Sequence, residues 1–296
     1  MAKKATKTKI RKNDPVVTEI LRNGIIAVTE EMKTNLMRTA YNIIIYEALD
    51  FTTGLFTPEG DTVSIGIGLP MFIRGMSETV KAKIRHFGRE NIKPGDIYVT
   101  NDSYTTGSHL NHFTFTLPIF HKKKLVGFAC CMAHWQDVGG NLGGVTTDIY
   151  SEGLQIPIMK LQREGKLNQD LVDVIMMNVR IPERAQGDLN AQIGAVRTGA
   201  ARFLELSRRY GVNEVLAAIE EILARSERRA LAVVIGEQRR QQIGRRRAHA
   251  VEQREIAVAV AEEPQHRHHP VDRVEKRRRR RDIPGTCLHP IWIGRA

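Results

Sequence analysis

The sequence predicts an α+β fold, in which a mixed or antiparallel sheet packs against long helices. Segments with strand composition are gathered between residues 51 and 161, and apolar residues recur at helical spacing before and after them. Two pairs of these strands are joined by short turns, as in hairpins. Because strands and helices do not alternate regularly, we expect an α+β class and not a parallel sheet built from βαβ units.

The first predicted element is a long amphipathic helix. Asp14 is a good N-cap, and Pro15 suits the first helical turn, where its missing N–H breaks no hydrogen bond. The apolar residues that recur at helical spacing are Val17, Ile20, Leu21, Ile25, Val28, Met32, Leu36 and Met37.

The strands of the sheet come next. The predicted elements are strands 51–56 and 62–65, a helix near 76–87, a strand at 96–100, and strands 113–120 and 125–134. Residues 57–61, with the sequence TPEGD, have the composition of a hairpin connection. Residues 121–124 form a second polar turn, so the two strands around that turn should pair.

Helices follow. The predicted elements are an extended segment at 154–161, a turn at 163–166, and helices at 168–179, 183–210 and 212–225. Asn168 caps the first of these helices, Pro182 restarts the chain before the second, and Gly211 ends the second at its C′ position.

Composition narrows the class of protein. The chain has 296 residues and 42% hydrophobic content, enough to bury a full core. It has no apolar run of about 18 residues, and no hydrophobic segment follows the N-terminal lysines, so we expect neither a membrane span nor a secretory signal. The cytoplasm is the expected location. Three cysteines without CxxC spacing argue against a disulfide framework or a zinc ribbon.

The net charge of +12 is concentrated at the two ends of the chain. Residues 1–12 contribute +6, residues 226–296 contribute +8, and the rest sums to −2. We therefore divide the chain into a basic, flexible N-terminus (1–12), a globular domain (13–225) and an Arg/His-rich tail (226–296). The globular part is slightly acidic, so a basic nucleic-acid-binding face is not expected there.

One stretch holds a set of side chains typical of metal sites. It reads TNDSYTTGSHLNHFTFTLPIF from Thr100 and ends CCMAHWQDVGGNLGG. The candidate residues on this predicted hairpin are Asp102, His109, His112, His134 and Asp137. Imidazole and carboxylate together suit Zn, Mn or Fe. The alternative is that each histidine is an ordinary hydrogen-bonded residue of a strand.

Several separated segments resemble the hydantoinase B family. The matching segments are DPVVTEILRNGIIAVTEEMKTNLMRTAYN, DFTTGLFTPEGDTV, KPGDIYVTNDSYTTGSHL, LVGFACCMAHWQDVGG and SEGLQIPIMKLQREGKLNQDLVDVIMMNVRIPERAQGDLNAQIGA. They occur in the family's order and span residues 13–225. The family includes the B-type components of ATP-dependent N-methylhydantoinases, the C-terminal half of 5-oxoprolinase, and subunits of acetone and acetophenone carboxylases.

The resemblance implies a two-component enzyme, a hetero-oligomer with an A-type ATP-binding subunit. That partner would use ATP to phosphorylate the substrate, a lactam or a ketone, and the B-type chain would complete lactam hydrolysis or, as the alternative, carboxylation. In this chain GxxxxGK[ST] is absent, so ATP is expected on the partner. A third interpretation, from another class, is a truncated, non-catalytic chain that binds the partner without turnover.

The resemblance also implies metal ligands. In carboxylase members a divalent metal is held by the histidine and aspartate of an HLxD motif and by a histidine of the next strand, which correspond to His109, position 112 and His134. This chain has HLNH, so His112 replaces the aspartate. Asp137 or Asp102 is expected to restore a carboxylate, as a ligand or as a catalytic group.

Other residues are candidates beside these. Asp137 or Glu152 can serve as a general base, although a loop carboxylate is more often a solvated surface group. Glu47 and Asp50 match family positions, and a capping role fits them as well as a role at the site. GxSxG does not occur, so Ser-His-Asp catalysis is not expected, and Ser108 is a weak nucleophile candidate.

The tail from Ser226 onward has sixteen arginines and one lysine, and it lacks the family's pattern. We expect residues 226–296 to be disordered or to represent a coding region read out of frame. The competing interpretation is an arginine arm for nucleic acid, which would bind without sequence preference because no folded motif accompanies it.

Overall fold

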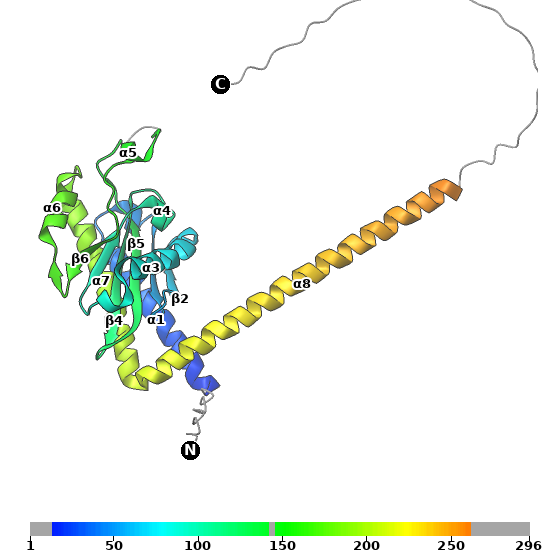
Figure 1. Ribbon diagram of the computed structural model, residues 1–296, viewed down its shortest axis with the longest axis horizontal. Helices are drawn as coiled ribbons and strands as arrows, with labels where there is room; N and C mark the ends of the chain where they lie inside the picture. Colours follow the sequence, from blue (N-terminus) through cyan, green and yellow to red (C-terminus); the bar gives the residue numbers. More distant parts are fainter. Residues whose placement is uncertain (1–13, 142–145, 262–296) are drawn as a thin grey trace, which may run out of the picture. The chain divides into compact units, whose positions relative to one another are not determined.

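The computed structural model describes residues 14–141 and 146–261. By the grouping of its contacts the chain forms two units, Met1–Val233 and Val234–Ala296. The described residues of the second unit belong to one helix, and the first unit contains the sheet and all remaining elements (Figure 1).

The first unit is built on a seven-stranded sheet in which all neighbouring strands are antiparallel. The strand order is β2-β1-β5-β4-β3-β6-β7. The strands are β1 (Phe51–Phe56), β2 (Thr62–Ile67), β3 (Ile97–Thr100), β4 (His112–His121), β5 (Lys124–His134), β6 (Met159–Arg163) and β7 (Lys166–Leu167). The predicted α+β class and the two predicted hairpins are confirmed.

Long helices cover both faces of this sheet, α1 (Pro15–Thr39) and α7 (Pro182–Tyr210) on one face and α3 (Ile73–Phe87) on the other. A further long helix, α8 (Val212–Ala261), follows α7. The shorter elements are α2 (Ile43–Tyr46), α4 (Ser103–Thr106), α5 (Ile149–Glu152) and α6 (Gln169–Met177), and 3₁₀ turns at Pro70–Phe72 and Arg89–Asn91. Side chains alternate along a strand, so β4 and β5 present one set of residues to each face. Phe113 and Trp135 share a core with α1 and α7, whereas Met132 packs with Met76 of α3.

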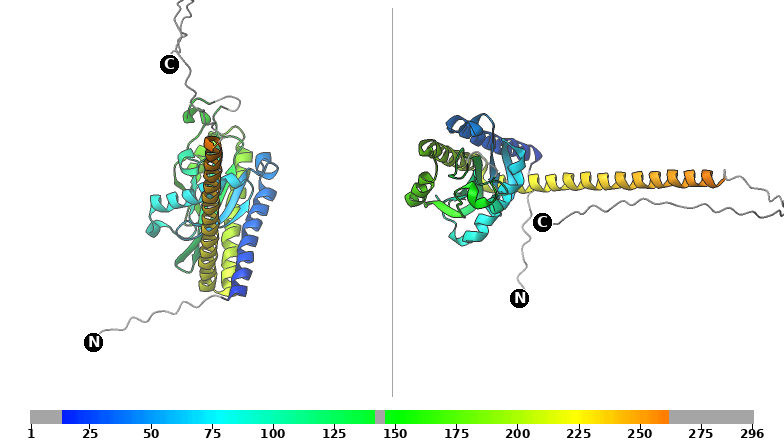
Figure 2. Two further views of the ribbon diagram at one scale, coloured as in Figure 1. Left: turned by 90° about the vertical axis from the view of Figure 1, so that its right-hand side faces the viewer. Right: turned by 90° about the horizontal axis from the view of Figure 1, so that it is seen from above.

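Local chemistry explains the ends and the packing of the two long helices that run side by side, α1 and α7 (Figure 2). The side chain of Asp14 accepts a hydrogen bond from the N–H of Val16 at 2.8 Å, as an N-cap should. Gly211 ends α7 with φ of +90°, a conformation that favours glycine. Where the helices meet, a Cβ added to Gly199 would come within 2.4 Å of Met32 Sδ, so glycine permits the close approach.

Some predicted boundaries are wrong. The extended segment predicted at 154–161 forms a strand only from Met159 onward. The last helix, predicted to end at Arg225, continues to Ala261, so residues 226–261 are helical and not disordered. Arginine, alanine, glutamate and glutamine dominate that stretch, and all four have high helix propensity. Residues 1–12 and 262–296 lie outside the described residues, and the out-of-frame hypothesis stays a prediction.

Among the described helices, none combines the length and the apolar content that crossing a membrane would take.

A fully buried lysine lies between α3 and the sheet. Lys83 donates hydrogen bonds to the carbonyl oxygen of Thr114 at 2.7 Å and to Thr116 Oγ1 at 3.0 Å. Burial lowers the pKa of Lys83 to about 8, because the interior disfavours the charged amine. Below pH 8 the lysine is therefore protonated in both the folded and the unfolded chain.

This burial predicts an unusual pH dependence of stability. Between pH 8 and the ordinary lysine pKa of 10.5, the unfolded chain holds a proton that the folded chain has lost, so the free energy of unfolding should rise with pH, by about 3 kcal/mol in all. Urea unfolding at pH 7.5 and 9.5 covers about 2 kcal/mol of this rise. In Lys83→Met the rise over that interval should be smaller by the same amount, and an identical rise in both proteins would contradict the prediction.

Candidate functional site

Three histidine rings meet at one end of the β4–β5 hairpin. His109 lies in the turn before β4, His112 is the first residue of β4, and His134 is the last residue of β5. The strand register places His112 directly opposite His134. The ring centroids are 4.4 Å apart for His109 and His112, and 4.9 Å apart for each of the other two pairs. The structure thus brings the three predicted histidines together.

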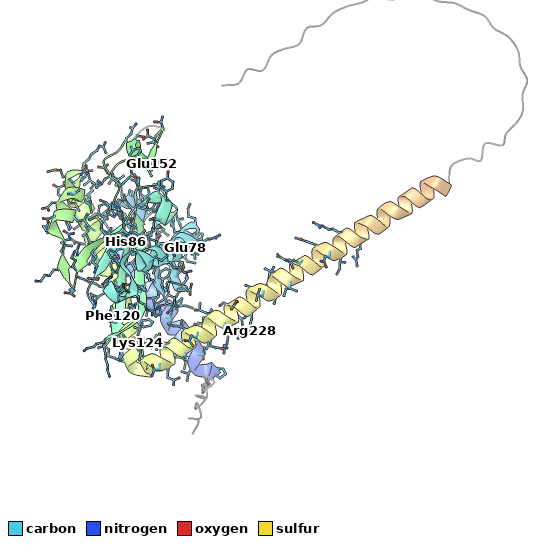
Figure 3. The ribbon with its side chains drawn as sticks, viewed as in Figure 1. Glu78, His86, Phe120, Lys124, Glu152 and Arg228 are labelled. Atoms are coloured by element: carbon cyan, nitrogen blue, oxygen red, sulfur yellow. The ribbon has the colours of Figure 1, made fainter. Side chains whose placement is uncertain are left out.

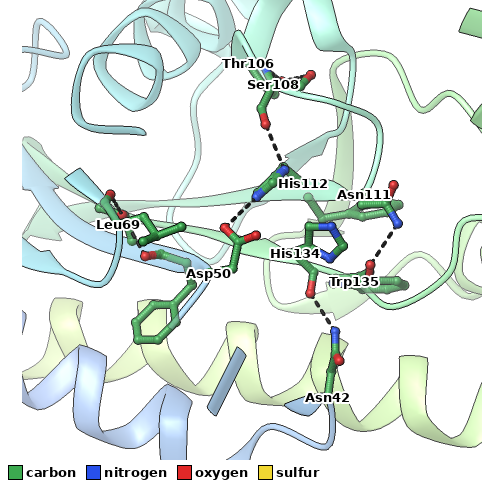
Figure 4. Close-up of polar contacts among 12 residues, drawn as sticks. Asn42, Asp50, Leu69, Thr106, Ser108, Asn111, His112, His134 and Trp135 are labelled. Atoms are coloured by element: carbon green, nitrogen blue, oxygen red, sulfur yellow. Dashed lines mark hydrogen bonds and ion pairs between the residues drawn. The ribbon is translucent and has the colours of Figure 1, made fainter. Parts of the chain in front are cut away.

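His112 stands at the centre of a chain of hydrogen bonds (Figure 4). Its Nδ1 lies 2.8 Å from Ser108 Oγ, and its Nε2 lies 3.1 Å from Asp50 Oδ1. Burial lowers the pKa of His112 to about 4, and His109 and His134 act in the same direction, while Asp50 opposes them. The ring is therefore neutral at neutral pH. Since a carboxylate only accepts, Nε2 carries the hydrogen and Nδ1 accepts one from Ser108.

Asp50 is the carboxylate of the cluster. It precedes β1, in a turn where Leu49 has the left-handed φ of +57°. Its backbone carbonyl accepts a hydrogen bond from the N–H of His134 at 3.0 Å, which fixes it beside the end of β5. Only its Oδ1 has a hydrogen bond within the described residues, to His112. Of the two roles that the sequence left open for Asp50, the structure favours the one at the site.

One ring nitrogen of His134 lacks a hydrogen-bond partner among the described residues. Its Nδ1 is buried and has no hydrogen bond to any described residue. Burial is the main cause that lowers the pKa of His134. Its carbonyl accepts a hydrogen bond from Asn42 Nδ2 at 2.8 Å, which holds the end of β5 in place (Figure 4). An unsatisfied buried nitrogen costs about 1–3 kcal/mol, which a ligand at this point would recover.

The side chains of the cluster have the right chemistry for a divalent cation, but their atoms are not arranged around a single point. Three imidazoles and a carboxylate are the ligand types that Zn, Mn and Fe take. Within the described residues, however, no group of three or more His, Cys, Asp or Glu side chains stands as it would around a bound metal ion. Both nitrogens of His112 are engaged by Ser108 and Asp50.

Asp102 and Asp137, the two aspartates that the sequence offers as ligands or catalytic groups, make their hydrogen bonds outside the histidine cluster. Asp102 caps α4, accepting from the N–H of Tyr104 at 3.1 Å and from Thr105 Oγ1 at 2.5 Å. Asp137 accepts from the backbone N–H and the side chain of Arg180 and lines a separate cavity of about 290 Å³. Neither has a recorded contact with the three histidines, and the carboxylate that the cluster has is Asp50. A catalytic role for Asp102 or Asp137 stays a prediction.

A cavity of about 500 Å³ opens beside the cluster. Its walls come from α4, the turn before β4 and residues 146–152, and they include Ser108 and His109. Ser103 also lines it, and the Oγ atom of Ser103 is buried without a hydrogen bond to any described residue. Small molecules can therefore reach His109 through this cavity.

Comparison with known proteins places the chain and its fold in a family. The family model described as hydantoinase B/oxoprolinase matches residues 14–269. The putative B-type subunit of a D-/L-hydantoinase from Pseudomonas sp. (strain NS671) is 31% identical over 75% of this chain and 39% of its own length. The beta subunit of caprolactamase from Pseudomonas jessenii is 32% identical, also over 75% of this chain and 39% of its own.

Two solved structures share the fold of this chain. The crystal structure of the ATP-dependent caprolactamase from Pseudomonas jessenii matches with a TM-score of 0.68 and 31% identity, over 74% of this chain and 39% of that one. Acetone carboxylase in its nucleotide-free form matches with a TM-score of 0.66 over 72% of this chain and 29% of that one, and at 19% identity it shows a shared fold alone. The chain thus spans about two fifths of the length of the two bacterial relatives.

Proposed function

The chain belongs to the hydantoinase B/oxoprolinase family, and from that premise we propose that it is the metal-containing B-type component of an ATP-dependent enzyme that opens cyclic amides. The observation that carries the proposal is the cluster of three imidazoles, with Asp50 bonded to His112 and His109 reached from an open cavity. The family and two relatives named for hydantoin or caprolactam support a lactam as the substrate class.

We assign the cation to His109, His134 and Asp50. Each of these residues retains a donor atom without a recorded protein partner, and in His134 it is the buried Nδ1. Such a cation would polarise the amide carbonyl or lower the pKa of a water molecule. The sequence predicts His112 as a further ligand, but its two nitrogens are already engaged, so we give it the role of orienting Asp50.

The remaining residues of the site position the reacting groups. The hydroxyl of Ser108 donates to His112 Nδ1 and so keeps the hydrogen of that ring on Nε2, where it meets Asp50. Asp102 caps α4 and shapes the turn that carries Ser108 and His109. The backbone N–H of Trp135 donates to the carbonyl of Asn111, and Asn111 Nδ2 donates to the carbonyl of Trp135. These two bonds hold the start of β4 beside the end of β5.

ATP is proposed to bind an A-type partner. The two relatives are named as subunits, so substrate activation is assigned to another component of the assembly. ATP hydrolysis by that partner, measured with a lactam present, should increase when this chain is added. If the chain binds the partner but adds no turnover, its role is non-catalytic.

Ketone carboxylation is the second candidate function. It is supported by the fold that this chain shares with acetone carboxylase, at 19% identity. Lactam opening is favoured because the two relatives above 30% identity described here are named for cyclic amides.

Removing His109 tests the cation site directly. The metal content of purified His109→Ala, determined by elemental analysis, should fall well below one ion per chain, because the site loses one of three proposed ligands. His86→Ala is the matched control, since His86 lies on α3 and is not part of the cluster (Figure 3). Full metal content in His109→Ala would remove His109 from the site.

A further inference from the structure

A second cavity, of about 290 Å³, lies at the start of α7 and shares no lining residue with the cavity beside His109. Its walls are residues 135–137, residues 179–181 and the first two turns of α7. The apolar part of its lining is Trp135, Val179, Ile181 and Ala185, and the charged part is Asp137, Arg180, Arg184 and Asp188. The cavity therefore combines an apolar wall with charged groups of both signs.

Two of these four charged side chains are engaged with each other. Arg180 Nη1 donates to Asp137 Oδ1 at 2.6 Å, and Arg180 Nη2 donates to the carbonyl oxygen of Gly140 at 2.7 Å. The second oxygen of Asp137 accepts from the backbone N–H of Arg180. Within the described lining, this pair leaves Arg184 and Asp188 as the charged side chains that a ligand can engage.

Asp188 is a buried carboxylate with one oxygen unengaged. The residue is 2% exposed, and its Oδ1 accepts from the N–H groups of Tyr41 at 2.8 Å and Asn42 at 3.2 Å. Its Oδ2 has no recorded hydrogen bond with a described residue. Burial raises the pKa of Asp188, although the two N–H groups and the charge of Arg184 oppose the rise. A cation that reached Oδ2 through the cavity would stabilise this buried charge.

Arg184 supplies a positive charge at the same cavity. Its side chain is exposed and has no recorded hydrogen bond or ion pair with a described residue. Arg184 and Asp188 are four residues apart on α7, so they lie on one face of the helix, about 6 Å apart along its axis. A guanidinium binds a carboxylate through two parallel N–H···O bonds. The start of α7 has no side-chain cap, so its free N–H groups add to the attraction for an anion.

We propose that this cavity binds a zwitterionic, open-chain amino acid, with its ammonium at Asp188 and its carboxylate at Arg184. The methylene groups between the two charges would pack against Val179, Ile181 and Ala185. A ligand with both charges serves both side chains at once, whereas a ligand with one charge leaves the other side chain without a partner. Hydrolysis of a cyclic amide yields an amine and a carboxylate on one chain, so the product of the proposed reaction belongs to this class, but binding here does not depend on that reaction.

Binding of three probes to the full chain tests the proposal. The probes are ε-aminocaproate, which carries both charges, and caproate and hexylammonium, which carry one each. The chain is first dialysed against a chelator, so that no probe carboxylate can bind a metal ion. Dissociation constants at neutral pH are measured by saturation-transfer NMR. We expect ε-aminocaproate to bind about 10-fold more tightly than either probe with a single charge, because it makes one more charge-assisted hydrogen bond.

Two variants assign the two ends of the ligand. Arg184→Gln should weaken the binding of ε-aminocaproate and of caproate about 10-fold without weakening that of hexylammonium. Asp188→Asn should weaken the binding of ε-aminocaproate and of hexylammonium about 10-fold without weakening that of caproate. Asparagine still accepts from the N–H groups of Tyr41 and Asn42, so the local fold should persist. Arg208→Gln, in the last turn of α7 and outside the lining, is the control and should change none of the three affinities.

Equal affinities for the three probes, no binding of ε-aminocaproate, or a variant that weakens both single-charge probes alike would each overturn the proposal. If Asp188→Asn unfolds, which circular dichroism would show, the comparison of the three probes and the exposed Arg184→Gln decide the matter. Selective binding of ε-aminocaproate with full metal content in His109→Ala would retain the amino-acid site and remove His109 from the cation site. Loss of metal in His109→Ala, with no binding of ε-aminocaproate to the unmodified chain, would do the reverse.

Discussion

Replacing Asp50 by asparagine is expected to lower the metal affinity of the proposed cation site and the proposed rate of lactam opening with an A-type partner, each by about 100-fold or more. Asparagine has nearly the shape of aspartate and still accepts a hydrogen bond from His112 Nε2, so the fold should persist. What is lost is the negative charge of Asp50, which bonds to His112 and is the only carboxylate with a recorded bond to a ring of the histidine cluster among the described residues.

Two measurements check this. Metal content after dialysis reports on the site without the partner, and the rate of ring opening reports on the assembled enzyme. Asp102→Asn is the informative comparison, because the sequence offers Asp102 as the missing carboxylate whereas the structure shows it capping α4. Loss of metal in Asp102→Asn, with retention in Asp50→Asn, would return the role to Asp102.

Replacing Lys160 by methionine should destabilise the domain by about 3–5 kcal/mol, the largest effect on stability that we expect. Lys160 Nζ lies 2.7 Å from Asp96 Oδ2, and the Asp96 side chain is 0% exposed. Methionine would leave this carboxylate buried without its counter-charge. The Nζ atom also lies 5.4 Å from the centre of the Phe87 ring, and that cation–π contact would be lost as well.

Acid should reduce the loss of stability that Lys160→Met causes. Burial by itself would raise the pKa of Asp96, but hydrogen bonds from Lys160, from the N–H groups of Glu164 and Lys93, and from Tyr98 outweigh it and leave the pKa below its ordinary value. The stabilisation by ionised Asp96 is therefore present at neutral pH. It fades as the pH falls below about 4, the unfolded value, and through the folded pKa.

Urea unfolding at pH 7 and pH 3 measures both parts of the prediction. The difference between the unmodified chain and Lys160→Met should be smaller at pH 3. Lys166→Met, an exposed lysine on the neighbouring strand β7, is the control and should change stability by less than about 0.5 kcal/mol. A Lys160→Met protein as stable as the control at pH 7 would contradict the prediction.

The sequence could predict the histidine cluster because a hairpin is local. The turn at residues 121–124 pairs β4 with β5 and so brings the two ends that carry His112 and His134 together. His109 follows because it lies three residues before His112. The exact pairing of His112 with His134 depends on a register shift between Ile119 and Phe120, which the sequence pattern does not predict.

Asp50 could not be placed in the same way, because its position depends on contacts distant in sequence. It reaches the histidines only because β1 pairs with β5, about 80 residues further along the chain. Asp137 is misleading for a similar reason. It lies three residues after His134, but its partner is Arg180, which belongs to the segment before α7. Ser108 is a weak candidate from sequence because no GxSxG motif accompanies it, although one turn of chain brings it to His112.

The β4–β5 hairpin has its histidines at one end and its turn at the other. His112 and His134 end the ladder that begins at His121 and Lys124, so about nine residue steps, or roughly 30 Å, separate the two ends. Lys122 in the turn has φ of +57°, a geometry that glycine also accepts readily. A fluorescent label or an affinity handle inserted at Lys122 and Lys123 should therefore let the chain be immobilised or followed without disturbing the histidine cluster.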